Sequence, residues 1–197
     1  MPSPMNKRYF LKIIFLFLLT LGSVGVVSGS FFLKQAFSNS LHAEEGITDV
    51  SRYQEIRHQI WSNQNSISHF PLEIPQTATN IRLMYHPGFM ENVKFLQVRF
   101  RLPKQKVNEL LAKYQEVSHY KYQGGNTNEH MNQKNGVPTT FFYTGNYEAN
   151  SFPPTYEILV LGANNRGKPG FEWNHGNSYG VAIDKYESEI VYWAEAW

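Results

Sequence analysis

The hydrophobic pattern of the chain changes character once, near residue 34. Between Lys12 and Lys34 lie 21 consecutive residues without a charge, Ile13 to Leu33. About 20 apolar residues in a helix cross a bilayer core of roughly 30 Å. Three cationic side chains stand at or before Lys12 and no acidic one does, and basic flanks stay on the cytoplasmic side. We therefore expect a cytoplasmic flank over residues 1–12, a single transmembrane anchor over 13–33, and export of everything that follows.

A cleavable signal peptide is the alternative for the same run. Its most apolar half, Ile13 to Leu21, has the length of a signal-peptide core, and Gly22 to Ser30 is rich in small residues. The best cleavage frame, Val27-Ser28-Gly29, contains no alanine, and Phe31 to Leu33 extend the apolar stretch to membrane length. These two features favour the uncleaved anchor, with a protein secreted after cleavage as the alternative.

Residues 34–49 are polar and weakly patterned, which predicts a stalk in front of a domain over residues 50–197. The first element expected in that domain is a short helix from about Ser51 to Trp61. Its tyrosine and isoleucine residues recur at helical spacing, and Ser51 with Gln54 fits the capping-box pattern.

Alternating apolar residues predict two strands after this helix. Residues Ile81 to Tyr85 alternate, and His86-Pro87-Gly88 predicts the turn that ends the first strand. In the second strand the even-numbered residues from Leu96 to Leu102 are apolar, whereas Gln97 and Arg99 occupy the other face. This alternation predicts a sheet with one buried and one wetter face.

The strongest helical pattern of the chain covers Lys104 to Ser118. Its apolar residues fall on one stripe with Leu110 and Leu111 at the centre, and Lys113 lies on the opposite side. We expect the helix to pack on the sheet through these two leucines.

Further apolar alternation predicts strands in the second half of the domain. They cover Thr139–Thr144, Tyr156–Ala163, and a hairpin of Ser178–Asp184 with Glu189–Glu195. Residues Tyr156–Leu161 are apolar on both faces, which predicts a central position. The expected fold class is therefore α+β, with a mainly antiparallel sheet of five or six strands against one long helix and a shorter N-terminal helix.

Two long polar loops separate these elements, His119–Pro138 and Asn164–Asn177. If the strand near Phe141 pairs antiparallel with Tyr156–Ala163, both loops leave the sheet at the same end. The C-terminal hairpin returns Trp197 to that end as well. We expect the two loops to meet there.

Composition limits the classes of function. Of the 18 Lys and Arg residues, four lie at or before position 34, which leaves 14 cations against 16 acidic groups in the exported part. A nucleic-acid-binding protein needs clustered cations, and none are present. The chain has no cysteine, which excludes disulfides, thiolate metal sites and a cysteine nucleophile. It also has no Asn-x-Ser/Thr acceptor site, which favours a bacterial envelope over a eukaryotic secretory route.

Two arrangements suggest a small exported hydrolase as one hypothesis. Residues 176–180 fit the G-x-S-x-G pattern of a nucleophile elbow, with Ser178 three residues after His175. That elbow requires a strand before the serine, a helix after it and a histidine later in the chain, whereas here a loop precedes, a strand follows and no later histidine exists. Glu129 and Glu172 lie in the two long loops and form the second arrangement, a carboxylate pair.

A binding surface is the leading hypothesis. The seven histidines lack the tight spacing of a zinc site, no phosphate-binding loop is present, and we therefore predict neither a metal nor a cofactor. The two loops instead gather amides, cations and a ring of the kind that binds a glycan or a peptide. The candidate binding residues are Asn126, His130, Arg166, Trp173, Asn174 and His175. The sequence thus favours a membrane-anchored, extracytoplasmic, non-catalytic accessory domain that binds an envelope protein or a glycan.

Overall fold

The computed structural model describes residues 46–61, 63–89, 93–125, 130–145 and 151–197. All of them belong to the second of two compact units, residues 41–197. The predicted span Ile13–Leu33 and residues 34–45 of the predicted stalk lie outside the described residues. Within those residues, no helix has both the length and the apolar character needed to cross a bilayer.

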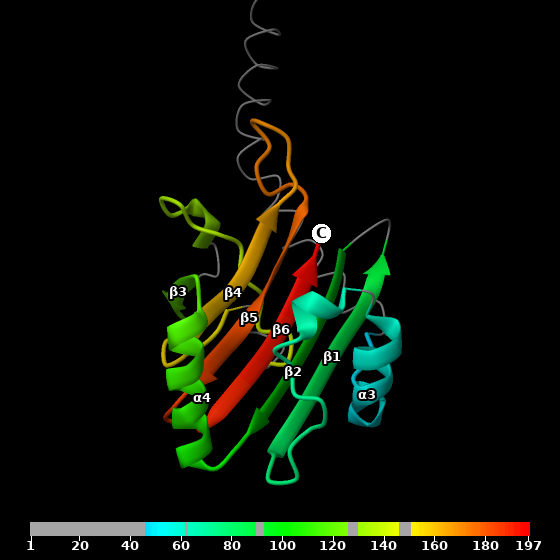
Figure 1. Cartoon of the computed structure of the whole chain (residues 1–197), viewed down its shortest axis with the longest axis vertical. Coiled ribbons are helices and arrows are strands. Elements are labelled where there is room, and N and C mark those ends of the chain that lie inside the picture. Colours follow the sequence, from blue (N-terminus) through cyan, green and yellow to red (C-terminus); the bar gives the residue numbers. More distant parts are fainter. Residues whose placement is uncertain (1–45, 62, 90–92, 126–129, 146–150) are drawn as a thin grey trace, which may run out of the picture. The chain divides into compact units, whose positions relative to one another are not determined.

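The domain is built on one six-stranded antiparallel sheet (Figure 1). The strands stand in the spatial order β1-β2-β6-β5-β4-β3, and every neighbouring pair is antiparallel. Their bounds are Thr79–Phe89 for β1, Val93–Arg101 for β2, Tyr120–Gln123 for β3, Glu157–Asn165 for β4, Gly176–Asp184 for β5 and Glu189–Ala196 for β6. The α+β class, the antiparallel sheet and the C-terminal hairpin are confirmed.

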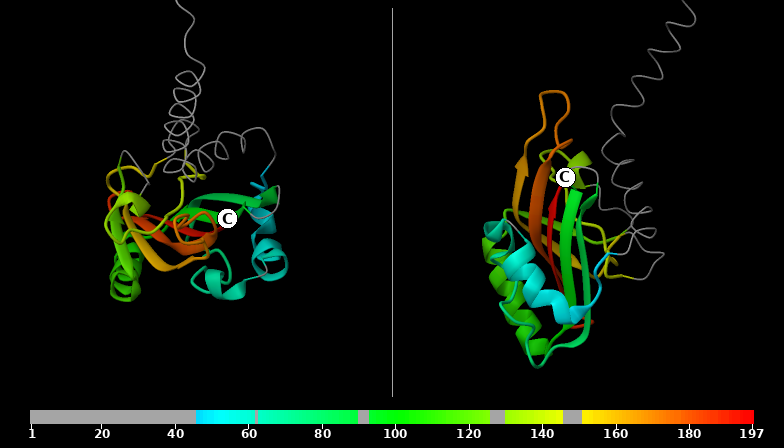
Figure 2. Two further views of the ribbon diagram at one scale, coloured as in Figure 1. Left: turned by 90° about the horizontal axis from the view of Figure 1, so that it is seen from above. Right: turned by 90° about the vertical axis from the view of Figure 1, so that its right-hand side faces the viewer.

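Two helical segments lie on the same face of this sheet (Figure 2). The 14-residue α4 runs from Lys104 to Val117 and begins directly after Pro103. The N-terminal segment combines η1 (Val50–Arg52), α3 (Tyr53–Glu55) and the π-helical η2 (Ile56–Ile60). Its first amides are capped by Asp49, which accepts a hydrogen bond of 2.9 Å from the Ser51 amide, and not by Ser51 as the capping-box pattern predicted.

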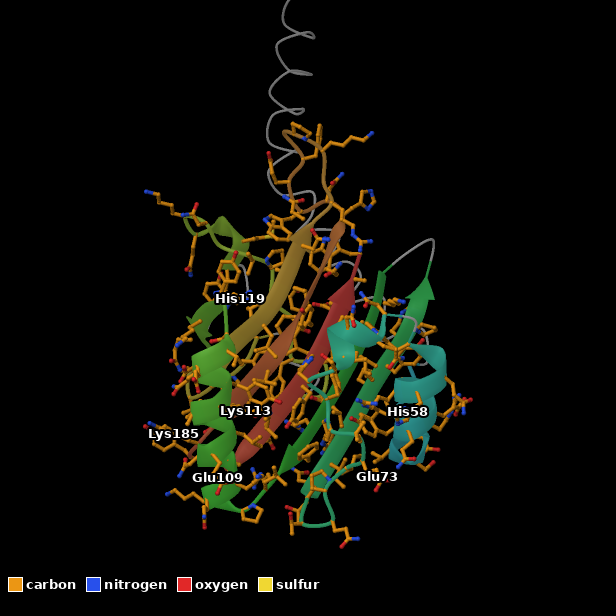
Figure 3. All side chains as sticks on the ribbon, in the orientation of Figure 1. His58, Glu73, Glu109, Lys113, His119 and Lys185 are labelled. Carbon is orange, nitrogen blue, oxygen red and sulfur yellow. The ribbon has the colours of Figure 1, made fainter. Side chains whose placement is uncertain are left out.

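The main core lies between the helical segments and the sheet. Val107 and Tyr114 are the buried residues of α4, and the Tyr114 ring meets Tyr192 of β6 edge-on at 6.2 Å. Leu110 and Leu111 are only partly buried beside them. Val107 and Tyr114 therefore form the centre of the contact with the sheet, where Leu110 and Leu111 were predicted. Lys113, labelled in Figure 3, is exposed.

The second face of the sheet is also buried, which corrects the prediction of a wetter face. Gln97 is fully buried and Arg99 is 8% exposed. Residues 137–145 and 151–156 cover them, as the packing of Phe142, Phe152 and Tyr156 on the sheet shows. Residues Thr139–Thr144, predicted as a strand, are irregular chain in this cover.

Three further predictions about strands need correction. β1 continues through His86-Pro87-Gly88, where a turn was predicted, with a register shift between His86 and Phe89 and a positive φ of 100° at Gly88. An edge strand tolerates proline because one row of its N–H groups has no ladder partner. β3 falls inside the predicted loop 119–138. β4 lies between β3 and β5, whereas β6 and β5 form the centre of the sheet.

Additional short helical turns connect these elements. They are η3 (Gln64–Ile67) and η4 (His130–Asn132). A chain segment also protects the outer edge of β1. Ile47 exchanges two backbone hydrogen bonds with Tyr85, of 2.9 and 3.0 Å, so part of this long edge strand is already paired.

Candidate functional site

The loop between β4 and β5, residues 166–175, extends beyond the end of the sheet (Figure 1). The C-terminal residue lies at its base, where Gly176 and Trp197 exchange two backbone hydrogen bonds of 2.9 and 3.0 Å. The Trp197 indole also donates to the Trp173 carbonyl at 2.7 Å. The prediction that Trp197 returns to this end of the sheet is therefore correct. We call this loop the β4–β5 loop.

Part of the other predicted loop reaches the same region. Val137, Val160 and Trp193 form a small buried cluster against which Tyr122 and Trp173 pack. Val137 belongs to the predicted loop 119–138 and Trp173 to the predicted loop 164–177. The structure thus brings the two predicted loops into one cluster, although β4 pairs with β3 rather than with a strand near Phe141.

The β4–β5 loop is held by its own hydrogen bonds. The Asn165 side-chain oxygen accepts from the Gly167 amide at 2.8 Å and from the Trp173 amide at 3.0 Å. The Arg166 amide donates to the His175 carbonyl at 2.8 Å and so extends the β4–β5 ladder into the loop. A loop fixed in this way presents its side chains without a large loss of conformational entropy on binding.

A tight turn forms the tip of this loop. The Phe171 amide donates to the Lys168 carbonyl at 2.8 Å across Pro169 and Gly170. Proline in the second position and glycine with a φ of 80° in the third are the features of a type II turn. The turn displays the Phe171 ring, whose residue is 55% exposed.

Most of the predicted binding residues of this loop are exposed to solvent. They are Arg166, Asn174 and His175, together with Lys168. The described residues contain no acidic partner in an ion pair with Arg166 or Lys168. Trp173 differs, because it is partly buried in the cluster, has a positive φ of 63° and supplies the carbonyl that fixes Trp197. Trp173 therefore supports the base of the loop and is not displayed to solvent as the other residues are.

His130 lies apart from these exposed side chains. It is 4% exposed and stacks on the Tyr122 ring, with centroids 4.2 Å apart and planes within 7°. Neither ring nitrogen has a hydrogen-bond partner within the described part of the chain. Burial lowers the pKa of His130 from 6.5 to about 4 because it penalises the charged imidazolium. Asn126, the remaining predicted binding residue, lies outside the described residues.

The serine hydrolase arrangement is not assembled. Ser178 is fully buried on the second face of the sheet, and its hydroxyl has no hydrogen-bond partner among the residues that the structure describes. His175 is exposed and lies in the extended ladder three residues earlier. Side chains three positions apart on an extended chain point to opposite faces. His175 is therefore not within reach as a base for this serine.

The carboxylate arrangement lacks an observable pair as well. Glu172 is exposed, and the amides of Glu172 and Gly170 hold its pKa below the usual value. Gly170 donates to the Glu172 carboxylate at 3.2 Å, so this acid stabilises the loop tip. Glu129 lies outside the described residues. No group of three or more metal-binding side chains occurs within the described ranges.

Sequence reasoning missed two features of this region. Phe171 follows a Pro-Gly pair, and that turn signal predicts its place at a loop tip. Trp193 lies in the buried cluster, and its indole nitrogen has no hydrogen-bond partner in the described ranges. Its ring crosses Gly180 of β5, where an added Cβ would lie 3.1 Å from the ring. Sequence periodicity alone does not indicate such a crossing.

Comparison with protein-family models, with curated proteins and with solved structures finds no match. The site must therefore be interpreted from its own geometry.

Proposed function

We propose that this chain is a membrane-anchored binding domain of a bacterial envelope that works outside the cytoplasm and does not catalyse a reaction. In this proposal Ile13–Leu33 spans the bilayer with residues 1–12 in the cytoplasm. The domain over residues 50–197 then faces an envelope protein or a wall component. The β4–β5 loop is its binding element.

The observation that carries this proposal is the combination of a fixed backbone with exposed side chains in the β4–β5 loop. Five hydrogen bonds described above hold the loop and its tip, whereas Arg166, Lys168 and Phe171 are directed to solvent and serve no role in the core. Loops that a rigid sheet positions commonly carry function. An exposed ring next to two cations is typical of a recognition surface.

The burial of Ser178 and the loop-bracing role of Glu172 support a function without catalysis. A nucleophile needs a base within hydrogen-bond reach. The described part of the site offers cations, amides and a ring, which are groups for binding. No observation specifically favours the hydrolase alternative.

Photocrosslinking from the loop tip tests the proposal. A photoreactive phenylalanine analogue replaces Phe171 in the full chain in its native cells, and the same analogue replaces Tyr186 as the control. Tyr186 is the matched position because it is 71% exposed and follows Lys185, in the turn between β5 and β6 at the other end of β5 from the β4–β5 loop (Figure 3).

We expect a discrete adduct from position 171 and none from position 186. The combined change Arg166→Ala with Lys168→Ala should remove the adduct. No adduct at position 171, or identical adducts from both positions, would contradict a binding role for the β4–β5 loop.

A further inference from the structure

Strand β4 is longer than the strand that covers its outer edge. β3 pairs with β4 only over residues 157–160, whereas β4 continues to Asn165. Figure 1 accordingly shows β3 beside the lower part of β4 alone. Residues 161–165 thus form an edge that leads directly into the β4–β5 loop. We call them the β4 edge.

The register shows which backbone groups of this edge point outward. Arg166 donates to His175, and Asn164 pairs with Asn177 two positions earlier in the same ladder. Hydrogen-bonded and non-hydrogen-bonded pairs alternate along an antiparallel ladder. The N–H and C=O groups of Ala163 and Asn165 therefore face away from β5.

These outward groups have no backbone partner in the described part of the chain. The ladder of β3 ends at Val160, and no other backbone hydrogen bond reaches Ala163 or Asn165 on that side. The opposite edge of the sheet is different, because Ile47 pairs with β1 there. Unpaired edge groups are a template for another strand unless the protein covers them.

We propose that the β4 edge takes up an extended, acidic segment of a partner protein by strand addition. This inference rests on the proposed binding function and specifies its ligand. Backbone groups of Ala163 and Asn165 supply donors and acceptors at the two-residue repeat of a strand, about 6.6 Å. A peptide backbone matches that repeat, and main-chain pairing at a free edge is an established mode of peptide recognition.

The β4–β5 loop supplies the preference for acidic side chains. Arg166 directly follows the edge, Lys168 comes two residues later, and both are exposed. An aspartate or glutamate of the added segment would lie near these cations. Charge complementarity of this kind selects the partner and its register.

Peptides selected from a random displayed library of 12-residue sequences on the full-length protein provide the probe. The tightest peptide is synthesised, and its affinity is measured against Ala163→Pro. Proline removes the outward N–H and leaves the bonds to β5 in place, which an edge strand tolerates. Ala163→Val is the matched control, because it adds similar bulk and keeps the N–H.

We expect the selected peptides to be acidic. Ala163→Pro should weaken their binding by about tenfold or more, because a donor and the close approach of the peptide are lost. Ala163→Val should change binding by less than about twofold. Failure to select any binder, or equal affinity for both variants, overturns strand addition.

Two further measurements keep the outcomes distinct. Amide hydrogen exchange in the unaltered protein should slow at Ala163 and Asn165 when peptide binds and stay constant at Asn164, even if Ala163→Pro fails to fold. Peptides that require Arg166 and Lys168 but tolerate Ala163→Pro would leave the proposed binding function standing and refute strand addition. Binding of isolated wall glycan without any peptide binder would refute strand addition as well.

Discussion

Gln97 provides the sharpest test of how the second face of the sheet is held. Its side chain is fully buried and makes four contacts with the covering segment. The amide nitrogen donates to the Phe141 carbonyl at 2.9 Å and to the Thr140 hydroxyl at 3.4 Å. The amide oxygen accepts from the Thr144 amide at 3.0 Å and from its hydroxyl at 2.8 Å. Gln97→Leu removes all four and keeps similar volume.

The expected loss of stability depends on which hydrogen bonds each former partner of Gln97 keeps after the substitution. The buried Thr144 amide would lose its partner, which costs about 1–3 kcal/mol. The Phe141 carbonyl keeps a hydrogen bond of 3.2 Å from the Thr140 hydroxyl, so its loss is nearer about 1 kcal/mol. Burial of the leucine methyl groups returns roughly 1 kcal/mol. We therefore expect Gln97→Leu to lower the free energy of unfolding by about 1–3 kcal/mol.

Urea denaturation of the full-length protein in a mild detergent measures this loss. Gln105→Leu is the control, because Gln105 is exposed on α4 and bonds only to Glu109 at 3.2 Å. The control should change stability by no more than about 0.5 kcal/mol. Faster amide exchange at Thr144 in Gln97→Leu would locate the effect. Equal, small losses in both variants would mean that Gln97 does not fix the covering segment to the sheet.

Three other predictions follow from burial and charge. In urea melts, Val107→Ala should lower the free energy of unfolding by about 2 kcal/mol. Leu110→Ala should cost less, because Leu110 is half-buried, and Lys113→Ala should cost no more than about 0.5 kcal/mol. The reverse order would mean that another face of α4 packs on the sheet. Folding lowers the pKa of His130 from 6.5 to about 4, so between these pH values the unfolded chain binds one proton more than the folded chain. The urea midpoint should therefore fall as the pH is lowered from 6.5 to about 4, and it should fall less in His130→Phe. A reporter that is active only after export should be active when fused to Trp197, whereas activity of a cytoplasm-only reporter at that position would refute the proposed topology.

Elements with a regular period were predictable from the sequence. The helix predicted over Lys104–Ser118 matches α4 to within a residue, and the hairpin predicted over Ser178–Asp184 and Glu189–Glu195 matches β5 and β6 to within two residues. Alternation reports which residues share a face, so it identified the main core correctly. It did not locate the contact on α4, because one apolar stripe is wide enough to dock at Leu110 or at Val107.

The second face was not predictable, because its cover has no period. Arg99 and Gln97 indicated water on that face, yet irregular chain in residues 137–145 and 151–156 packs over it. This chain accepts and donates the hydrogen bonds of Gln97, whereas Arg99 lies over the Phe142 ring and donates to Glu189 of β6. Such burial depends on long-range partners that no local pattern encodes. Thr139–Thr144 failed as a strand prediction for the same reason, since Thr140 and Thr144 bond to the side chain of Gln97 and form no backbone ladder with a strand.

The loop that carries the candidate site could be predicted from the sequence, whereas the strand edge beside it could not. Polar loop composition pointed to residues 164–177, and the exposed Arg166 and Lys168 lie there. The β4 edge was hidden, because its existence depends on where β3 stops. β3 is only four residues long, so it leaves residues 161–165 of β4 without an outer neighbour. The unpaired backbone and the cationic loop thus lie side by side because the β4–β5 hairpin extends beyond the end of its flanking strand β3.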